Sequence, residues 1–111
     1  METLLERFIR YCKINTRSNE KSSTVPSSEN QVVFAKMLAQ VLVDLGFDEV
    51  NYKPDNGFVS ATIKSNVDHE VDTIGFIAQY DTADFNSENI RPRVIEYSDG
   101  NPIVLTETTG L

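Results

Sequence analysis

The sequence is poor in cysteine and histidine, and it has no long apolar run. Cys12 is the single cysteine among 111 residues, which excludes an internal disulfide and a zinc cluster built from several thiols. A lone thiol fits a reducing compartment, so we expect a cytoplasmic protein. No apolar run approaches the roughly 20 residues that cross a bilayer, and the charged start METLLERFIRYCK is unlike a secretory signal. We therefore expect no membrane segment.

Positive charge is also scarce. Ten Lys and Arg residues are outnumbered by 17 Asp and Glu residues, and the formal net charge is −7. A field of this sign disfavours nucleic acids and anionic membrane surfaces as partners. An apolar content of 40% in a chain of 111 residues is typical of one soluble domain with a modest core.

The first 28 residues predict a helix followed by a loop. Thr3 and Glu6 have the spacing of a capping box, in which each residue satisfies a free amide of the first helical turn. Apolar residues then recur at steps of three and four as far as Cys12, which we expect to be a small core residue. Residues 15–28 are rich in Ser, Thr and Asn and have no apolar period, which predicts an unusually long loop.

A second helix is predicted after this loop. Ser28 and Gln31 repeat the capping-box spacing. The apolar residues that follow have the clearest helical period in the chain. Gly46 stands just beyond the last of them, where a left-handed helix terminus favours glycine.

Strand-forming residues dominate the rest of the chain. Residues 50–63 contain the turn sequence Pro-Asp-Asn-Gly between two β-prone runs, which predicts a hairpin. Residues 73–80 are apolar or small on both faces, which is typical of a central strand covered on both sides. Residues 93–97 and 103–106 could each add a short strand. The pattern predicts an α/β fold with helices packed on a mixed β-sheet.

Asp81 directly follows the predicted central strand, in the stretch GFIAQYDT. Ligands of such sheets bind beyond the carboxyl ends of the strands, where loops can vary on a fixed scaffold. Aspartate is equally common as an ordinary turn residue. Position alone leaves both interpretations open.

Two stretches resemble a known family. LLERFIRYCKINTRSNEKSSTVPSSENQ and VDTIGFIAQYDTADFNSENIRPRVIEYSDG are similar to the opening of peptidase T, the tripeptide aminopeptidase family of the di-zinc aminopeptidase and deacetylase superfamily. The resemblance covers essentially the whole chain. It implies that residues 1–111 are the N-terminal part of an incomplete catalytic domain with a zinc-peptidase-like fold.

The resemblance also identifies candidate site residues. The family pattern has a zinc-binding histidine two residues before an aspartate that orients its imidazole. Gln79 stands at the histidine position and Asp81 at the aspartate position. Because an amide is a weak zinc ligand, we expect no tight zinc binding and no metal ligand in this chain, although zinc is the metal of the family. His69 lies in the polar stretch before the strand and is expected to be a solvated loop residue.

Three hypotheses about function remain open. In the first, the chain is a fragment of a peptidase T-like enzyme that releases N-terminal residues from tripeptides, and it is inactive alone. Its expected partners are small peptides in the family, together with a complementing C-terminal segment or other copies of the chain. The second is a small non-catalytic binding or assembly module derived from that family. The third is an independent hydrolase using Asp81 and Asp84, for which the sequence offers neither nucleophile nor activated base.

Overall fold

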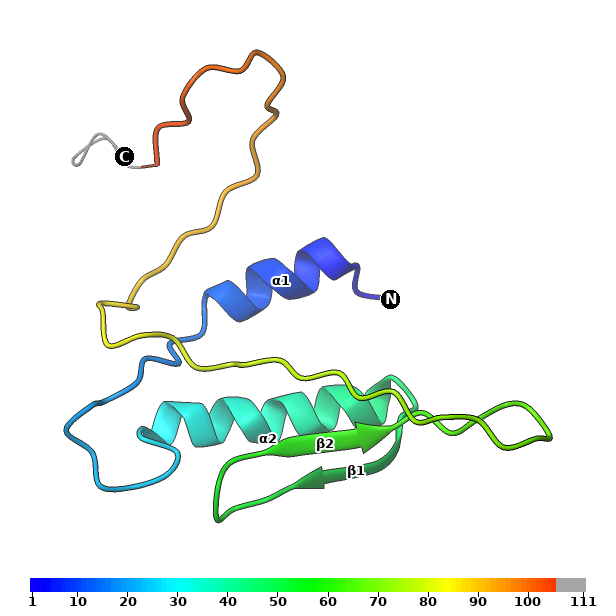
Figure 1. The fold of residues 1–111 in the computed structure, drawn as a ribbon. Coiled ribbons are helices and arrows are strands. Elements are labelled where there is room, and N and C mark those ends of the chain that lie inside the picture. The colour runs from blue at the N-terminus through cyan, green and yellow to red at the C-terminus, as the bar shows by residue number, and fades with distance from the viewer. Residues whose placement is uncertain (106–111) are drawn as a thin grey trace.

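The structure, a computed structural model of the chain, describes residues 1–105. Its elements within these residues are two helices and two strands: α1 (Leu4–Cys12), α2 (Glu29–Asp44), β1 (Asp48–Tyr52) and β2 (Val59–Thr62). Figure 1 shows α2 lying along the β1–β2 hairpin, while the chain after β2 continues without a regular helix or strand. Neither helix in this part of the chain is long and apolar enough to cross a membrane.

Helix α1 begins with the predicted capping box. The Thr3 hydroxyl accepts from the Glu6 N–H at 3.2 Å, and the Glu6 carboxylate accepts from the Thr3 N–H at 2.7 Å. Glu2 adds a second constraint, because its carboxylate binds Arg10 at 2.6 Å and Arg7 at 3.1 Å. The hydrogen bond from Arg10 is the main reason that the pKa of Glu2 falls to about 2.

The apolar face of α1 is not covered by the rest of residues 1–105. No residue of this helix is buried, and the Leu4 side chain is 82% exposed. Cys12 is only partly buried, so the expectation that it is a core residue is not met in full. The helix contacts the rest of the chain near its C-terminal end, where the Tyr11 ring meets Phe34.

Helix α2 confirms the predicted boundaries but corrects the second capping box. The Ser28 hydroxyl accepts from the Gln31 N–H at 3.4 Å. The Gln31 side chain does not bind the Ser28 amide. Its oxygen accepts from the Ser27 N–H instead. At the other end Gly46 has φ +83°. Its N–H donates to the Val43 carbonyl at 2.9 Å, as a left-handed helix terminus requires.

The predicted hairpin is confirmed. Strands β1 and β2 pair antiparallel, with Tyr52 opposite Val59. The connection closes with hydrogen bonds from the Lys53 N–H to the Phe58 carbonyl at 2.8 Å and from the Gly57 N–H to the Lys53 carbonyl at 2.7 Å. Gly57 has φ +72°, a conformation that glycine adopts without steric cost.

The core lies at the α2 residues Phe34 and Ala35. The Phe34 side chain is 5% exposed. Its ring meets Tyr11 edge-on at a centroid distance of 5.3 Å and Tyr80 at 5.9 Å. A side chain at Gly57 would collide with Pro26 and would come 2.8 Å from the Tyr80 hydroxyl. The core is therefore a small aromatic contact that joins α1, α2, the hairpin turn and the segment around residue 80.

The chain has the expected combination of helices and strands, but the expected mixed sheet is absent from residues 1–105. The sheet there is a single antiparallel pair, and α2 is the one helix that packs on it. The predicted central strand, residues 73–80, is extended without strand pairing. Phe76 and Ile77 are 94% and 98% exposed. A strand that is apolar on both faces needs neighbours at its edges and covers on both faces, and the hairpin supplies neither.

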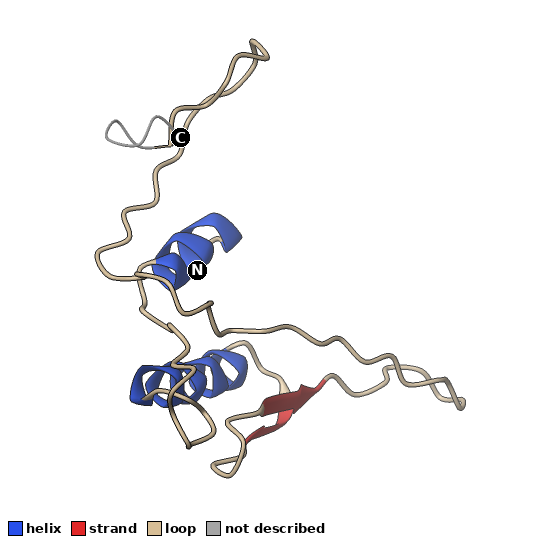
Figure 2. Cartoon of the chain, turned by 60° about the vertical axis from the view of Figure 1, so that its left-hand side comes forward, coloured by secondary structure: helices blue, strands red, loops and turns tan. Residues whose placement is uncertain are grey.

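The short strands predicted at residues 93–97 and 103–106 are also absent as far as residue 105, and Thr106 lies outside the described residues. Figures 1 and 2 show the chain beyond β2 first leaving the α2–hairpin unit, then running back past α2 to the loop that follows α1, and then leaving again. The Cα radius of gyration is 18.0 Å, whereas a compact domain of this length has roughly 13 Å. Apart from Tyr80, whose ring contacts Phe34, residues 63–105 therefore contribute little to the core.

The core assignment predicts a contrast between two phenylalanines. Phe34→Ala should lower the free energy of unfolding by roughly 3 kcal/mol, because it removes a buried ring and leaves a cavity. Phe76→Ala should change it by less than about 0.5 kcal/mol, because its ring is already in water. Urea unfolding followed by circular dichroism measures both values. Equal losses in the two variants would contradict the assignment.

Candidate functional site

The segment carrying the candidate site residues rejoins the folded unit at residues 80–84. The Thr82 N–H donates to the Thr16 carbonyl at 3.1 Å, and the Ser18 N–H donates to the Thr82 carbonyl at 2.9 Å. Arg17 and Thr82 are thereby paired as an isolated parallel bridge. Figure 1 shows this yellow segment beside the blue loop that follows α1. The pairing fixes the backbone immediately after Asp81.

Side chains alternate between solvent and core around this point. Gln79 and Asp81 are both exposed, whereas Tyr80 between them is partly buried. The Tyr80 hydroxyl donates to the Gly57 carbonyl at 3.1 Å, and its ring packs against Phe34. Extended backbone turns successive side chains to opposite sides. Insertion of Tyr80 therefore directs Gln79 and Asp81 away from the core.

The Tyr80 hydroxyl and the Asp81 carboxylate lie in different surroundings. Burial is the main reason that the pKa of Tyr80 rises above its ordinary value, with smaller contributions from Tyr52 and Asp81. The Asp81 carboxylate accepts from the Ser18 hydroxyl at 3.5 Å, the outer limit of a hydrogen bond. Asp81 is thus positioned mostly by backbone and only weakly by a side-chain contact.

Asp84 is held more firmly than Asp81. Its carboxylate forms an ion pair with the Arg17 guanidinium at 2.7 Å and accepts from the Glu20 N–H at 3.5 Å. The hydrogen bond from Arg17 is the largest cause lowering the pKa of Asp84. A carboxylate stabilised in its charged form is a weak base, so the geometry gives no support to a hydrolase using Asp81 and Asp84.

The donors present do not fit a zinc ion by themselves. Among residues 1–105, no three His, Cys, Asp or Glu side chains gather closely enough to hold a metal. His69 has a 69% exposed side chain and faces Asp68 at 3.5 Å, as expected of a solvated loop residue. At the candidate position Gln79 offers an amide oxygen, a weaker zinc ligand than imidazole. No metal chemistry can be derived from this set alone.

Sequence reasoning missed the residues that hold Asp81 in place. The Gln31 amide donates to the Thr16 carbonyl at 3.1 Å and to the Ser18 hydroxyl at 3.3 Å, the residues on which Thr82 and Asp81 dock. The sequence signal was present but ambiguous, because a glutamine three residues after a helix cap usually bonds back to that cap.

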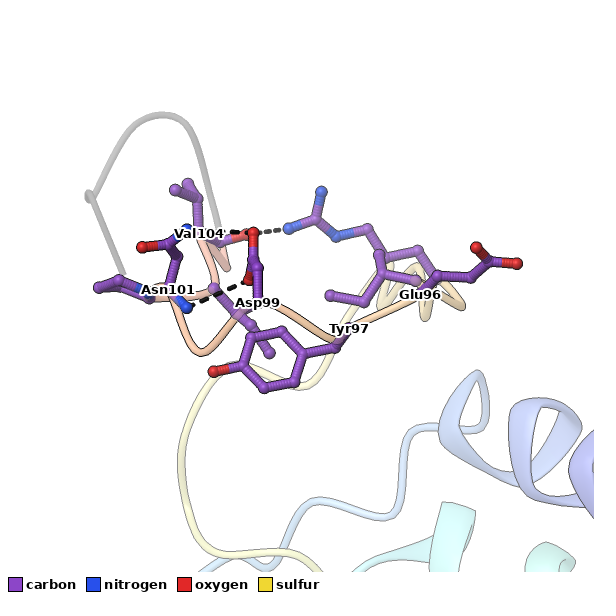
Figure 3. A pocket seen from close by; sticks show the side chains of 9 residues that line it. Glu96, Tyr97, Asp99, Asn101 and Val104 are labelled. Carbon is purple, nitrogen blue, oxygen red and sulfur yellow. Dashed lines mark hydrogen bonds between the residues drawn. The ribbon is translucent and has the colours of Figure 1, made fainter.

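A separate hollow lies at residues 93–104, far along the chain from Asp81. The hollow has a volume of about 290 Å³. Figure 3 shows the side chains that line it, among them Glu96, Tyr97, Asp99, Asn101 and Val104. Asp99 accepts from both nitrogens of Asn101 at 3.1 Å, which closes a turn. Both residues of this turn line the hollow, and none of the candidate site residues lines it.

Comparison with known proteins identifies relatives along nearly the whole chain. Peptidase T of Enterococcus faecalis is 48% identical over 109 residues, which is 98% of this chain and 27% of the relative. Peptidase T of Fusobacterium nucleatum is 50% identical over 105 residues, 95% of this chain and 25% of the relative. Peptidase T of Limosilactobacillus fermentum is 50% identical over 97 residues, 87% of this chain and 24% of the relative. No protein-family model matches the chain.

The matched region is short relative to these proteins. The chain spans about a quarter of the length of the curated relatives it matches. The similarity predicted from the two quoted stretches is confirmed.

The Asp84–Arg17 pair predicts a pH dependence of docking. Because the pKa of Asp84 is lowered in the folded chain, the pair stabilises docking fully above the ordinary aspartate pKa of about 4. This contribution is lost as the pH falls through the lowered value. Arg17→Gln should raise the Asp84 midpoint toward the ordinary value, as measured by NMR titration of its carboxyl carbon; the hydrogen bond from the Glu20 N–H remains. Arg91→Gln removes the same charge elsewhere and should leave the midpoint unchanged. Identical Asp84 midpoints in wild type and Arg17→Gln would refute the pairing.

Proposed function

Because the chain is homologous along nearly its whole length to an N-terminal portion of peptidase T, we propose that residues 1–111 are the N-terminal part of a peptidase T-like catalytic domain. The observation that carries this proposal is the near-complete coverage of the chain at about half identity. The proposed activity of the completed domain is zinc-dependent release of N-terminal residues from tripeptides. We propose a cytoplasmic location, which the single cysteine favours.

Asp81 is proposed to occupy the position of an aspartate that orients a metal-binding imidazole. Support comes from its place beside the docked Thr82 and from its exposure together with Gln79. Zinc, when bound in the family, would polarise the substrate carbonyl and activate water. Gln79 has no ring nitrogen for Asp81 to orient. We therefore propose that the chain alone is inactive and that even a completed domain would be impaired at this position.

We propose that another polypeptide covers the exposed apolar residues. Ile74, Phe76 and Ile77 are exposed on backbone without strand pairing, and the apolar face of α1 is open as well. Apolar surface of this extent marks an interaction site or an aggregation hazard. A complementing C-terminal segment would cover these residues, and without one the chain should associate with itself. A non-catalytic module, the alternative, would have to leave the same residues in water.

Complementation tests the proposed function directly. The chain would be co-expressed with the part of the Enterococcus faecalis relative that lies beyond the matched region, and tripeptide hydrolysis would be measured in zinc buffer. Gln79→His should raise the rate by roughly 100-fold or more over the wild-type chain, because loss of a residue that only supports a metal ligand already costs about 10- to 100-fold. Gln79→Asn is the matched control and should give no gain. Adding Asp81→Asn to Gln79→His should remove most of the gain.

Two outcomes would count against this proposal. Equal rates with glutamine and histidine at position 79, in a complex shown to form, would remove the assigned ligand position. A monomeric chain that unfolds in one sharp, reversible thermal transition without its complement would favour the non-catalytic module.

A further inference from the structure

The most completely bonded buried side chain among residues 1–105 belongs to Gln31. It is 3% exposed and lies in the first turn of α2. Its amide oxygen accepts from the Ser27 N–H at 3.0 Å and from the Ser27 hydroxyl at 3.2 Å. Its amide nitrogen donates to the Thr16 carbonyl and the Ser18 hydroxyl. A glutamine amide has two donors and an oxygen with two lone pairs, so its full bonding capacity is used.

The orientation of this amide is fixed by backbone groups. The Ser27 N–H can only donate and the Thr16 carbonyl can only accept. Exchanging the oxygen and nitrogen of Gln31 would place donor against donor and acceptor against acceptor. A buried amide paired in this way would lose several hydrogen bonds at once and leave their partners without bonds away from water. Only one orientation is therefore compatible with the fold.

Both partners of the Gln31 nitrogen also bind the segment that carries Asp81. The Thr16 carbonyl accepts a second hydrogen bond from the Thr82 N–H. The Ser18 hydroxyl, while accepting from Gln31, donates to the Asp81 carboxylate. A carbonyl with two lone pairs and a hydroxyl with one donor can sustain both contacts simultaneously. Gln31 thus connects the rigid start of α2 to the backbone and the carboxylate at the candidate site.

We propose that Gln31 is a positioning residue for Asp81, acting through Thr16 and Ser18. The inference rests on the proposed function, since Asp81 matters for catalysis only if that proposal holds. The geometric part is independent: Gln31 determines whether residues 81–82 dock on residues 16–18. The side chain of Gln31 bonds to Ser27, Thr16 and Ser18 and reaches Asp81 only through them, so its effect on the site is one of placement.

Gln31→Glu separates positioning from helix stability. The carboxylate keeps the shape of the side chain and still accepts from Ser27, and glutamate at this position of a helix suits both the cap and the helix dipole. It cannot donate, however, and it would face the Thr16 carbonyl with negative charge. The Ser18 hydroxyl would then no longer accept a hydrogen bond from residue 31. It would donate to the new carboxylate instead of to Asp81.

The test is amide hydrogen exchange by NMR on the whole 111-residue chain without metal. In Gln31→Glu the protection factors of the Thr82 and Ser18 amides should fall roughly tenfold, the equivalent of one net hydrogen bond. Protection of the Ser27 amide and of the α2 interior should be retained. Gln31→Met, which can neither donate nor accept, should lose protection at Ser27 as well. Gln40→Met, on the exposed side of α2, is the matched control and should change none of these amides.

The measured amides distinguish a positioning role of Gln31 from a general loss of stability. Unchanged protection at Thr82 and Ser18 in Gln31→Glu would overturn the proposal, as would a Thr82 amide that is unprotected in the wild-type chain. A uniform fall across α2 would also overturn it, because that pattern is global destabilisation. Since the measurement uses no metal and no substrate, failure of the complementation experiment leaves this result unaffected, and the reverse also holds.

Discussion

The tertiary structure of residues 1–105 depends on the burial of one ring, that of Phe34. Its edge-on contacts with Tyr11 and Tyr80 attach the end of α1 and the segment around residue 80 to α2. The second of these contacts also connects the hairpin, because Tyr80 donates to the Gly57 carbonyl. Aromatic pairs of this kind contribute roughly 0.5–1.5 kcal/mol beyond burial. In a core this small, such a contribution decides which segments are attached at all.

The contact between Tyr80 and Phe34 also explains why Gln79 and Asp81 have a defined position that requires no ligand. Tyr80 can reach Phe34 only if the extended backbone turns its neighbours outward. Exposure of Gln79 and Asp81 therefore follows from packing and needs no ligand. The pairing of Thr82 with Thr16 and Ser18 then limits how far this backbone can shift. Hydrogen bonds and one aromatic contact are thus sufficient to place Asp81, and they do so without any group that could react with a substrate.

The features that were predicted correctly from sequence depend on neighbouring residues. The box of Thr3 and Glu6 forms because both partners lie within one helical turn. Gly46 ends α2 because no other residue type adopts its backbone conformation as easily. The prediction for residues 73–80 was wrong for the opposite reason. Their apolar pattern indicates that a strand here would need neighbouring strands and covering helices. Whether such elements are present depends on distant parts of a chain.

Gln31 shows the same limit at the level of one side chain. Its distance from Ser28 predicts a local cap, and the backbone half of that cap does form. The side chain instead binds Ser27 on one side and Thr16 on the other, because a carbonyl 15 residues earlier is brought within reach by the loop. The Ser27 and Ser28 amides are donors of the same kind, so spacing alone cannot tell which of them the Gln31 oxygen accepts from. The loop of residues 15–28 looked featureless in sequence for this reason: its order comes from hydrogen bonds to α2 and to residues 81–84, and these contacts place Asp81 with little apolar burial of the loop itself.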